Sequence, residues 1–175
     1  MTRALDFKEE PPTIAYLDPS FLVNLLLSDA KFHKEVKEYS QRLKKKGTIL
    51  ILSHLGLDEI WFALLKAFAV RDYGLKRGFR KLTEDPETVK KYVEDIEKAT
   101  TVILELPRLF VVEVTFERAL GSLEFVKKYG LLPRDALHAY TTLAAGIHAM
   151  ITTDADFARV EELSVYTCNP KALQR

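Results

Sequence analysis

Short apolar runs alternate with longer amphipathic segments along almost the whole chain, and this alternation limits the folds that it can adopt. The run TILIL at 48–52 is continuously apolar after its threonine, which is typical of a strand buried on both faces of a parallel sheet. Further strand-like runs stand at 13–18, 109–114, 149–153 and 164–167. Because helical segments separate these runs, the sequence predicts an α/β fold, with a parallel sheet covered by helices on both faces.

Helix signals stand between the strand runs. Residues 31–46 repeat apolar residues at spacings of four and three, and Gly47 ends that helix. Ser53 is a good N-cap for a helix over about 54–71. Residues 72–85 are basic and contain glycine, so an exposed loop is predicted there. The remaining predicted helices span about 19–27, 86–100, 116–128 and 133–145.

Length and composition favour one folded domain. The chain has 175 residues, 47% of them hydrophobic and 29% charged, which suits a real core and excludes a disordered chain. Residues 1–12 carry mixed charge and end in two prolines, so we predict an N-terminal tail. Residues 13–175 contain no linker or repeat, and we predict that they form a single domain.

Charge and cysteine content narrow the function classes. Lys and Arg number 26 against 25 Asp and Glu, which argues against a histone-like binder of nucleic acids. Cys168 is the single cysteine, so no internal disulfide can form and a reducing cytoplasm is expected. The N-terminal segment has no apolar signal core, and no apolar run approaches the ~20 residues that span a bilayer. We therefore predict a soluble cytoplasmic protein without a membrane partner.

Four acidic residues stand where the predicted elements meet: Asp18, Glu59, Asp135 and Asp154. Asp18 and Asp154 end strand runs, while Glu59 and Asp135 lie near the starts of helices. Ligands of parallel sheets collect at the carboxyl ends of the strands, so all four can face one edge. Carboxylates that converge repel one another unless cations hold them, and oxygen-only clusters suit Mg²⁺ or Mn²⁺.

Four segments that contain these acids stand in the order of a known family: YLDPSFLVNLLL, SHLGLDEIWFALL, LLPRDALHAYTTLAAGI and MITTDADFARV. Over nearly all of residues 13–167 the chain resembles PIN-domain ribonucleases, and most of all the VapC-type toxins of toxin–antitoxin pairs. The resemblance implies a PIN-like three-layer α/β/α sandwich with a central, mainly parallel sheet. It also implies a catalytic metal site built by Asp18, Glu59, Asp135 and Asp154.

The same resemblance implies a Mg²⁺- or Mn²⁺-dependent endoribonuclease that acts on RNA as a toxin, pairs with a small antitoxin protein and forms a homodimer. The chemistry agrees, because phosphodiester hydrolysis needs an activated water and charge stabilisation, and divalent metals supply both. The apolar helices at 21–27 and 57–68 are candidate contact surfaces. Residues 70–108 are longer than the matching stretch of compact family members, which leaves partner geometry and RNA access open.

Several residues in this pattern have two readings. Each acid alone could cap a helix and interact with its dipole. Asp58 competes with Glu59, because adjacent helical residues point about 100° apart; the family pattern, with the acid directly before IWFALL, favours Glu59. Asp156 is either a further metal ligand or the cap of a short helix at 155–160.

Polar neighbours of the acids are also ambiguous. Thr152 and Ser20 could orient Asp18 or simply terminate their elements. His138 lies one turn after Asp135 and is either a hydrogen-bond donor behind the metal ligands or a packed core residue. Basic side chains that could meet RNA phosphates are Arg134 and the cluster of Lys76, Arg77, Arg80 and Lys81; the cluster could equally be a solvated loop.

Other functions remain possible. A catalytically silent PIN-like domain could act as a binding or assembly module, and an RNA-processing housekeeping nuclease could use the same site. A phosphatase of the haloacid dehalogenase type would carry a second Asp where this chain has Ser20. A receiver domain would carry an acidic pair before its nucleophilic Asp and a lysine on a late strand, which this sequence lacks. The RNA target, cleavage position and antitoxin identity are not specified by the sequence.

Overall fold

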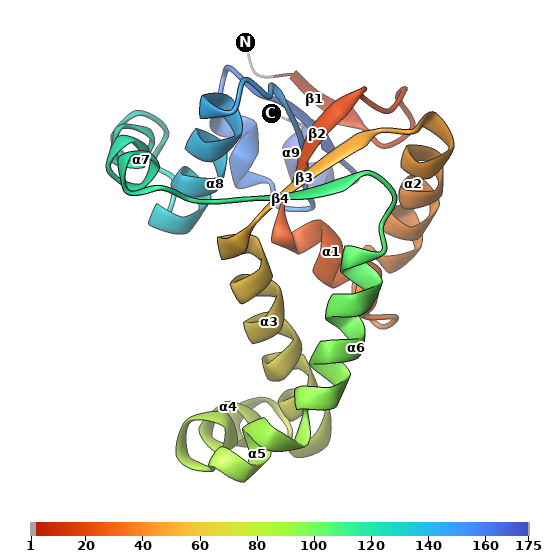
Figure 1. The fold of residues 1–175 in the computed structure, drawn as a ribbon, viewed down its shortest axis with the longest axis vertical. Coiled ribbons are helices and arrows are strands. Elements are labelled where there is room, and N and C mark those ends of the chain that lie inside the picture. The colour runs from red at the N-terminus through yellow and green to blue at the C-terminus, as the bar shows by residue number, and fades with distance from the viewer. Residues whose placement is uncertain (1–2, 175) are drawn as a thin grey trace.

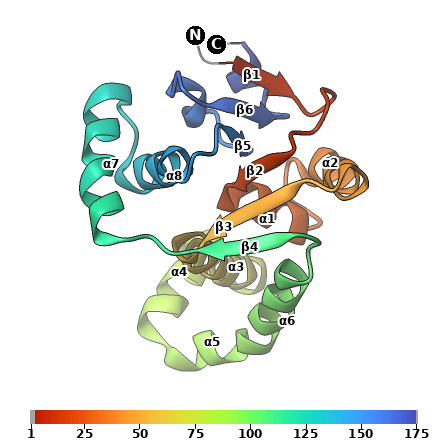
Figure 2. The ribbon, with the colours of Figure 1, turned by 45° about the horizontal axis from the view of Figure 1, so that its top comes forward.

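The computed structural model describes residues 3–174, which form a six-stranded, all-parallel sheet with helices on both faces (Figures 1 and 2). The strand order is β1-β6-β5-β2-β3-β4. The strands are β1 (Arg3–Asp6), β2 (Ile14–Leu17), β3 (Ile49–Ser53), β4 (Leu109–Val112), β5 (Ala149–Ile151) and β6 (Ser164–Thr167). The α-helices are α1 (Pro19–Leu26), α2 (His33–Lys46), α3 (His54–Tyr73), α4 (Leu75–Glu84), α5 (Pro86–Lys91), α6 (Val93–Leu104), α7 (Phe116–Tyr129), α8 (Pro133–Ala144) and α9 (Pro170–Leu173), with a 3₁₀ helix η1 (Asp156–Arg159).

Successive strand residues enter two different cores, as the pleat requires. Leu17 and Leu52 belong to the core shared with α1, α2, α3 and α6, while their neighbours Tyr16 and Ile51 belong to the core shared with α8. In Figure 2, α7 and α8 lie on one side of the sheet, and α1, α2 and α6 lie on the other. The predicted three-layer α/β/α sandwich with a parallel sheet is confirmed.

The predicted helix signals act as expected around the central strands. Gly47 ends α2 with a left-handed φ of 71°, which glycine adopts without strain. Ser53 caps α3, since its Oγ accepts from Gly56 N at 3.1 Å. Gly47 therefore determines where α2 ends, and Ser53 determines where β3 ends and α3 begins. Helix α3 carries Glu59.

The loop predicted at 72–85 is wrong, because most of that segment is helix α4. Gly78 lets α4 approach α3 closely: a Cβ there would lie 2.6 Å from the carbonyl oxygen of Ala69. The predicted helix at 86–100 is also broken, into α5 and α6, at Tyr92. The Tyr92 ring is buried beside Phe68, and its hydroxyl donates to Asp72 at 2.9 Å. These tertiary contacts override the local signals.

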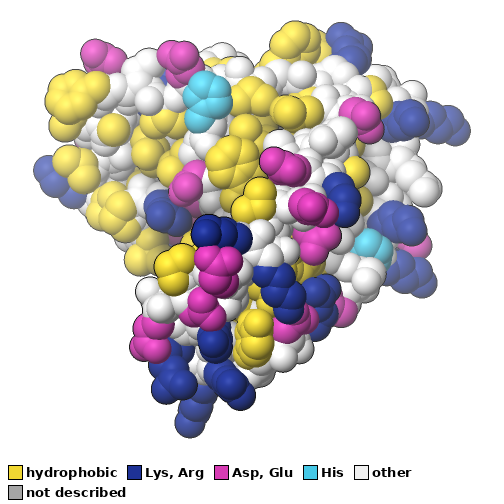
Figure 3. Space-filling model, turned by 60° about the horizontal axis from the view of Figure 1, so that its bottom comes forward, with side chains coloured by type: hydrophobic (Ala, Val, Ile, Leu, Met, Phe, Trp, Pro, Cys, Tyr) yellow, Lys and Arg dark blue, Asp and Glu magenta, His cyan; other side chains and the backbone are white. Residues whose placement is uncertain are grey.

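Helices α3, α4, α5 and α6 form an arm that extends from the sheet (Figure 1). The Trp61 indole N–H donates to Thr100 Oγ1 at 2.9 Å and ties α3 to α6. In the face seen from the end of the arm, positive and negative side chains are intermixed (Figure 3). Arg80 and Lys81 of the predicted basic cluster pair with Glu84 and Asp85, at 3.5 Å and 2.9 Å. Half of that cluster is therefore neutralised within the arm.

The tail predicted at 1–12 needs correction where the structure describes it. Arg3–Asp6 form β1, which pairs in parallel with β6 at the edge of the sheet. A four-residue strand at an edge depends on its partner strand more than on its own sequence pattern, so the local sequence did not reveal it. Residues 1 and 2 lie outside the described residues. Within residues 3–174, no helix combines the length and the apolar character needed to cross a bilayer.

Candidate active site

The four predicted acids come from four elements that meet at the carboxyl edge of the sheet. Asp18 follows β2 directly, and Asp154 follows β5, the strand that pairs with β2. Glu59 lies in the second turn of α3, and Asp135 in the first turn of α8. The charges of Asp154, Asp18 and Glu59 all act on Asp135. The fold therefore brings together residues that are far apart in the sequence.

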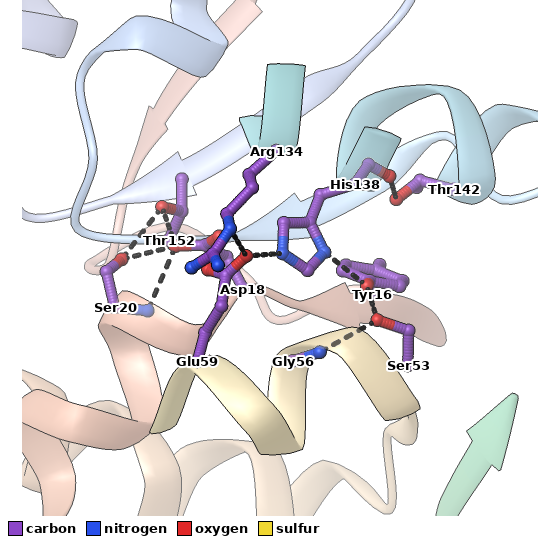
Figure 4. A network of polar contacts seen from close by, with 10 residues as sticks. All are labelled: Tyr16, Asp18, Ser20, Ser53, Gly56, Glu59, Arg134, His138, Thr142 and Thr152. Carbon is purple, nitrogen blue, oxygen red and sulfur yellow. Dashed lines mark hydrogen bonds and ion pairs between the residues drawn. The ribbon is translucent and has the colours of Figure 1, made fainter. Parts of the chain in front are cut away.

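Asp18 is both a helix cap and a member of this cluster. It is the N-cap of α1, and its Oδ2 accepts hydrogen bonds from the Ser20 N–H at 3.1 Å and from the Ser20 hydroxyl. Thr152 Oγ1 donates to the same oxygen at 2.8 Å (Figure 4). Burial raises the pKa of Asp18, while His138 and these hydroxyl donors act in the opposite direction. The two readings of Asp18 are thus compatible.

Thr152 links Asp18 to Asp154. Its hydroxyl oxygen accepts from the Asp154 N–H at 2.9 Å while it donates to Asp18. Asp154 Oδ1 in turn accepts from the Asp156 N–H at 2.8 Å and shapes the turn into η1. Thr152 is fully buried, so its hydroxyl works in a region with little solvent screening. The Thr152 side chain therefore orients one carboxylate and the backbone of another.

Asp135 is the acid with the fewest hydrogen-bond and ion-pair partners among residues 3–174. Within residues 3–174 its carboxylate makes no hydrogen bond or ion pair, although it is half-buried. Burial, followed by the charges of Asp154 and Asp18, raises the pKa of Asp135 to about 6. The direction is the one expected for a carboxylate that shares its surroundings with other negative charges.

Glu59, and not Asp58, faces the cluster. Asp58 is exposed, whereas the Glu59 side chain is 19% exposed and meets two cationic or donor groups. His138 Nε2 lies 3.3 Å from Glu59 Oε1, and Arg134 Nε lies 3.9 Å from the same oxygen (Figure 4). His138 is 1% exposed, so it is a core residue that also reaches the site. Arg134 borders the acids, as its position in the sequence suggested.

Asp156 stands at the margin of this cluster. Its Oδ1 accepts from Arg159 at 2.8 Å, and it is the first residue of η1, whose N-cap position is occupied by Ala155. The helix-cap reading of Asp156 is therefore wrong, since the turn is shaped by Asp154. Asp156 lines a surface hollow with Asp154, Ser20 and Lys171. A role for Asp156 as a metal ligand stays a prediction.

Two contributors to the site were missed in the sequence. Tyr16 lies inside a buried strand run, where a tyrosine predicts only core packing, yet its hydroxyl contacts His138. Lys171 lies in α9, far along the chain from the acidic motifs, and only the fold brings it beside Asp154. The one sequence feature that could have indicated a role for Tyr16 beyond packing is its place in an apolar strand, two residues before Asp18.

The donor set fits a hard divalent cation that keeps much of its water. Within residues 3–174, no group of three or more His, Cys, Asp or Glu side chains is arranged closely enough to hold a metal ion by itself. Mg²⁺ requires few protein ligands and retains several waters, so such a group is not needed. Among the described contacts, every hydrogen bond to the Asp18 carboxylate uses Oδ2, which leaves Oδ1 available, and Asp135 has both oxygens available. Carboxylate oxygens with raised pKa values gain most from a nearby cation.

The fold and the acidic edge define an α/β protein whose site lies at the carboxyl ends of a parallel sheet. The family model of the PIN domain matches residues 15–163, and the chain therefore belongs to the PIN domain family.

Two curated relatives match most of the chain, and both come from Methanocaldococcus jannaschii. Ribonuclease VapC6 is 25% identical over 154 residues, which cover 88% of this chain and 97% of the relative. Ribonuclease VapC2 is 27% identical over 144 residues, which cover 81% of this chain and 88% of the relative.

Solved structures agree on the fold. VapC20 of Mycobacterium tuberculosis, described as a sarcin-ricin loop cleaving toxin, has a TM-score of 0.55 at 19% identity. The match covers 83% of this chain and 92% of that chain. VapBC2 of Rickettsia felis, solved with a DNA fragment from its promoter, has a TM-score of 0.54 at 15% identity, with coverage of 87% and 96%.

Proposed function

We propose that this protein is a Mg²⁺- or Mn²⁺-dependent endoribonuclease that hydrolyses RNA phosphodiester bonds, with Asp18, Glu59, Asp135 and Asp154 as the catalytic metal-binding residues. The observation that carries the proposal is that acids from other elements converge on half-buried Asp135: burial, followed by the charges of Asp154 and Asp18, raises its pKa to about 6. A field that opposes ionisation of one carboxylate favours a cation in the same place. Family membership and the names of the relatives support the same chemistry.

The division of labour follows from the contacts. When bound, divalent cations supply charge stabilisation for the phosphoryl oxygens and an activated water. Asp18, oriented by Ser20 and Thr152, offers Oδ1 to the cation site. Asp135 and Glu59 approach from α8 and α3. Arg134, which is 60% exposed next to Glu59, is placed to contact a phosphate of the RNA strand.

The decisive test compares three proteins on a labelled single-stranded RNA: the wild type, Asp135→Asn and Asp58→Asn. With Mn²⁺ the wild type should cut internally, and a chelator should stop it. Asp135→Asn should lose about a thousandfold in rate, equivalent to about 4 kcal/mol of transition-state stabilisation. Asp58→Asn is the matched control, because it removes the same charge from an exposed position on α3. It should cut like the wild type.

Equal rates for the wild type and Asp135→Asn, or cutting that persists in the chelator, would contradict the metal site. An inactive wild type that still binds RNA would favour the binding or assembly module instead. Circular dichroism should confirm that Asp135→Asn is folded.

We further propose that the nuclease is the toxin of a toxin–antitoxin pair. The relatives' VapC names and the VapBC assembly among the solved structures support this role. Induced expression of the wild type should stop growth, expression of Asp135→Asn should not, and a short neighbouring reading frame should restore growth when co-expressed. An RNA-processing housekeeping enzyme would instead be tolerated without any such partner.

A homodimer is proposed on the apolar side chains that the single chain leaves exposed. Phe62 on α3 is 49% exposed, and Phe116 and Leu120 on α7 are 73% and 54% exposed. Exposed apolar patches mark protein contact surfaces, so these side chains of α3 and α7 are the candidates for such a surface. Light scattering of the purified chain should give twice the monomer mass of 20.0 kDa. Substituting Phe116 with Asp should shift the protein toward the monomer if α7 lies in the interface.

A further inference from the structure

We propose that His138 and Tyr16 are positioning residues for Glu59, and that together they set the affinity of the site for divalent cations. This inference rests on the proposed function, since it concerns how one of the proposed metal ligands is held. Neither residue touches the cation or the RNA in this scheme. Both act through the Glu59 carboxylate.

A continuous chain of polar contacts leads from the start of α3 to Glu59 (Figure 4). Ser53 Oγ, which caps α3, lies 2.7 Å from the Tyr16 hydroxyl. The same hydroxyl lies 2.7 Å from His138 Nδ1. His138 Nε2 then lies 3.3 Å from Glu59 Oε1. The chain joins β3, β2, α8 and α3, and it ends on the helix whose first turn Ser53 caps.

The ring of His138 has one orientation that satisfies both ends of the chain. An ionised carboxylate can only accept hydrogen bonds, so Nε2 must carry a proton where it faces Glu59. Nδ1 then faces the Tyr16 hydroxyl oxygen at 2.7 Å, and that hydroxyl donates its own proton to Ser53 Oγ. A ring flip would place carbon atoms at both contacts, so the hydrogen bonds of the ring to Tyr16 and to Glu59 would both be lost. Tyr16 therefore holds the imidazole ring in the orientation that presents Nε2 to Glu59.

Burial separates this chain from an ordinary surface ion pair. Tyr16, Ser53 and His138 are each 1% exposed or less, so their hydrogen bonds are screened little by solvent. The second partner of Glu59, Arg134, is 3.9 Å away and 60% exposed, which makes it a looser constraint. Groups that hold metal ligands from behind commonly change metal affinity by 10–100-fold when they are removed.

A purely structural role would predict something different. A histidine retained only for packing needs partners for its two nitrogens anywhere in the core, and its loss would lower stability alone. Here one nitrogen ends on an acid of the candidate site, and His138 lies one turn from Asp135 on the same face of α8. The geometry therefore couples the position of Glu59 to the helix that carries Asp135.

The test measures Mn²⁺ binding to Tyr16→Phe by electron paramagnetic resonance, beside Tyr39→Phe as the matched control. Tyr39 is also buried, but its hydroxyl makes no hydrogen bond to the residues that the structure describes, and it lies in the other core. Tyr16→Phe should weaken Mn²⁺ binding about tenfold. Its RNase rate should recover toward that of the wild type at saturating Mn²⁺. Tyr39→Phe should bind Mn²⁺ like the wild type.

A second pair of variants tests the histidine directly. His138→Gln keeps an amide donor that can reach Glu59, whereas His138→Leu removes it. Gln should therefore retain more Mn²⁺ affinity than Leu, although both lack the imidazole. If His138 acted through stability alone, the effects of His138→Gln and His138→Leu would follow the packing lost and the lost contact with the buried Tyr16 hydroxyl. They would not depend on whether a donor to Glu59 remains.

The possible outcomes separate the two proposals. If the wild type binds no Mn²⁺, the proposed metal site is wrong. If the wild type binds Mn²⁺ and Asp135→Asn does not, the site stands. In that case, Tyr16→Phe and His138→Leu proteins that are folded and bind Mn²⁺ within twofold of the wild type would overturn the positioning role alone. Should Tyr16→Phe fail to fold, the comparison of His138→Gln with His138→Leu decides the question.

Discussion

The candidate site has two halves that are held in different ways. In the bonded half, Asp18 and Asp154 accept hydrogen bonds from hydroxyls and backbone N–H groups. In the open half, Asp135 has no such partner among residues 3–174, and Glu59 is held by His138 and, more loosely, by Arg134. Hydrogen bonds to a carboxylate favour its charged form, whereas burial next to like charges opposes it. The bonded half is therefore ordered before any cation binds. The carboxylates of the open half gain the most electrostatic stabilisation when a cation binds.

The largest expected effect is on the open half. Saturating Mn²⁺, at about a thousand times its dissociation constant, should raise the free energy of unfolding of the wild type by about 4 kcal/mol. Asp135→Asn should lose most of this gain, because it removes a proposed ligand that has no other partner among residues 3–174. Urea denaturation with and without Mn²⁺ measures the difference. An Asp135→Asn protein that Mn²⁺ stabilises as strongly as the wild type would show that the open half does not hold the cation.

The next effect tests the bonded half. Thr152→Val keeps the shape of the side chain but removes the hydroxyl that joins Asp18 to the Asp154 N–H. Without metal, the free energy of unfolding should fall by about 1–3 kcal/mol, because buried polar groups lose their partner. Thr141→Val is the matched control: Thr141 is fully buried, yet its hydroxyl has no hydrogen-bond partner in the described part of the chain. It should cost nothing or stabilise the protein slightly.

Equal losses in Thr152→Val and Thr141→Val, measured by the same denaturation series, would mean that the Thr152 hydroxyl contributes no more than ordinary packing. The two halves would then differ less than their contacts suggest.

The smallest effect is the pH dependence of stability in a chelator. The pKa of Asp135 is raised from 3.8 to about 6 in the folded state. Between these values the folded protein holds a proton that the unfolded chain has released, so the free energy of unfolding should fall as the pH rises from about 4 to about 6. Asp135 is only half-buried, and solvent screening keeps the change modest. Asp135→Asn should flatten this part of the curve; an unchanged slope would place the titration elsewhere.

Much of the fold follows from local signals that operate near their own residues. The strand runs, the Ser53 cap and the Gly47 stop all lie within a few residues of what they control, so the sequence alone predicted β2, β3, β4, β5 and β6 and the helices α1, α2, α3, α7 and α8. The four acids were proposed partly for the same reason and partly from the family resemblance, since each follows a strand run or lies in the first two turns of a helix.

The errors fall where distant contacts outweigh local patterns. Helix α4 exists because Gly78 allows a close approach to α3, and the break at Tyr92 follows from a side chain that packs inward against Phe68. Strand β1 needs β6 as its partner. None of these contacts is encoded within a short window of residues.

For the site, local order along the chain was enough to name four acids and their chemistry. The choice between Asp58 and Glu59 needed the direction in which α3 leaves the sheet, and the link from Ser53 through Tyr16 and His138 needed four elements packed together. Periodicity and capping act over single turns and strands, and they are readable in one dimension. Which buried hydroxyl meets which ring nitrogen depends on packing across the sheet, and only the folded chain decides it.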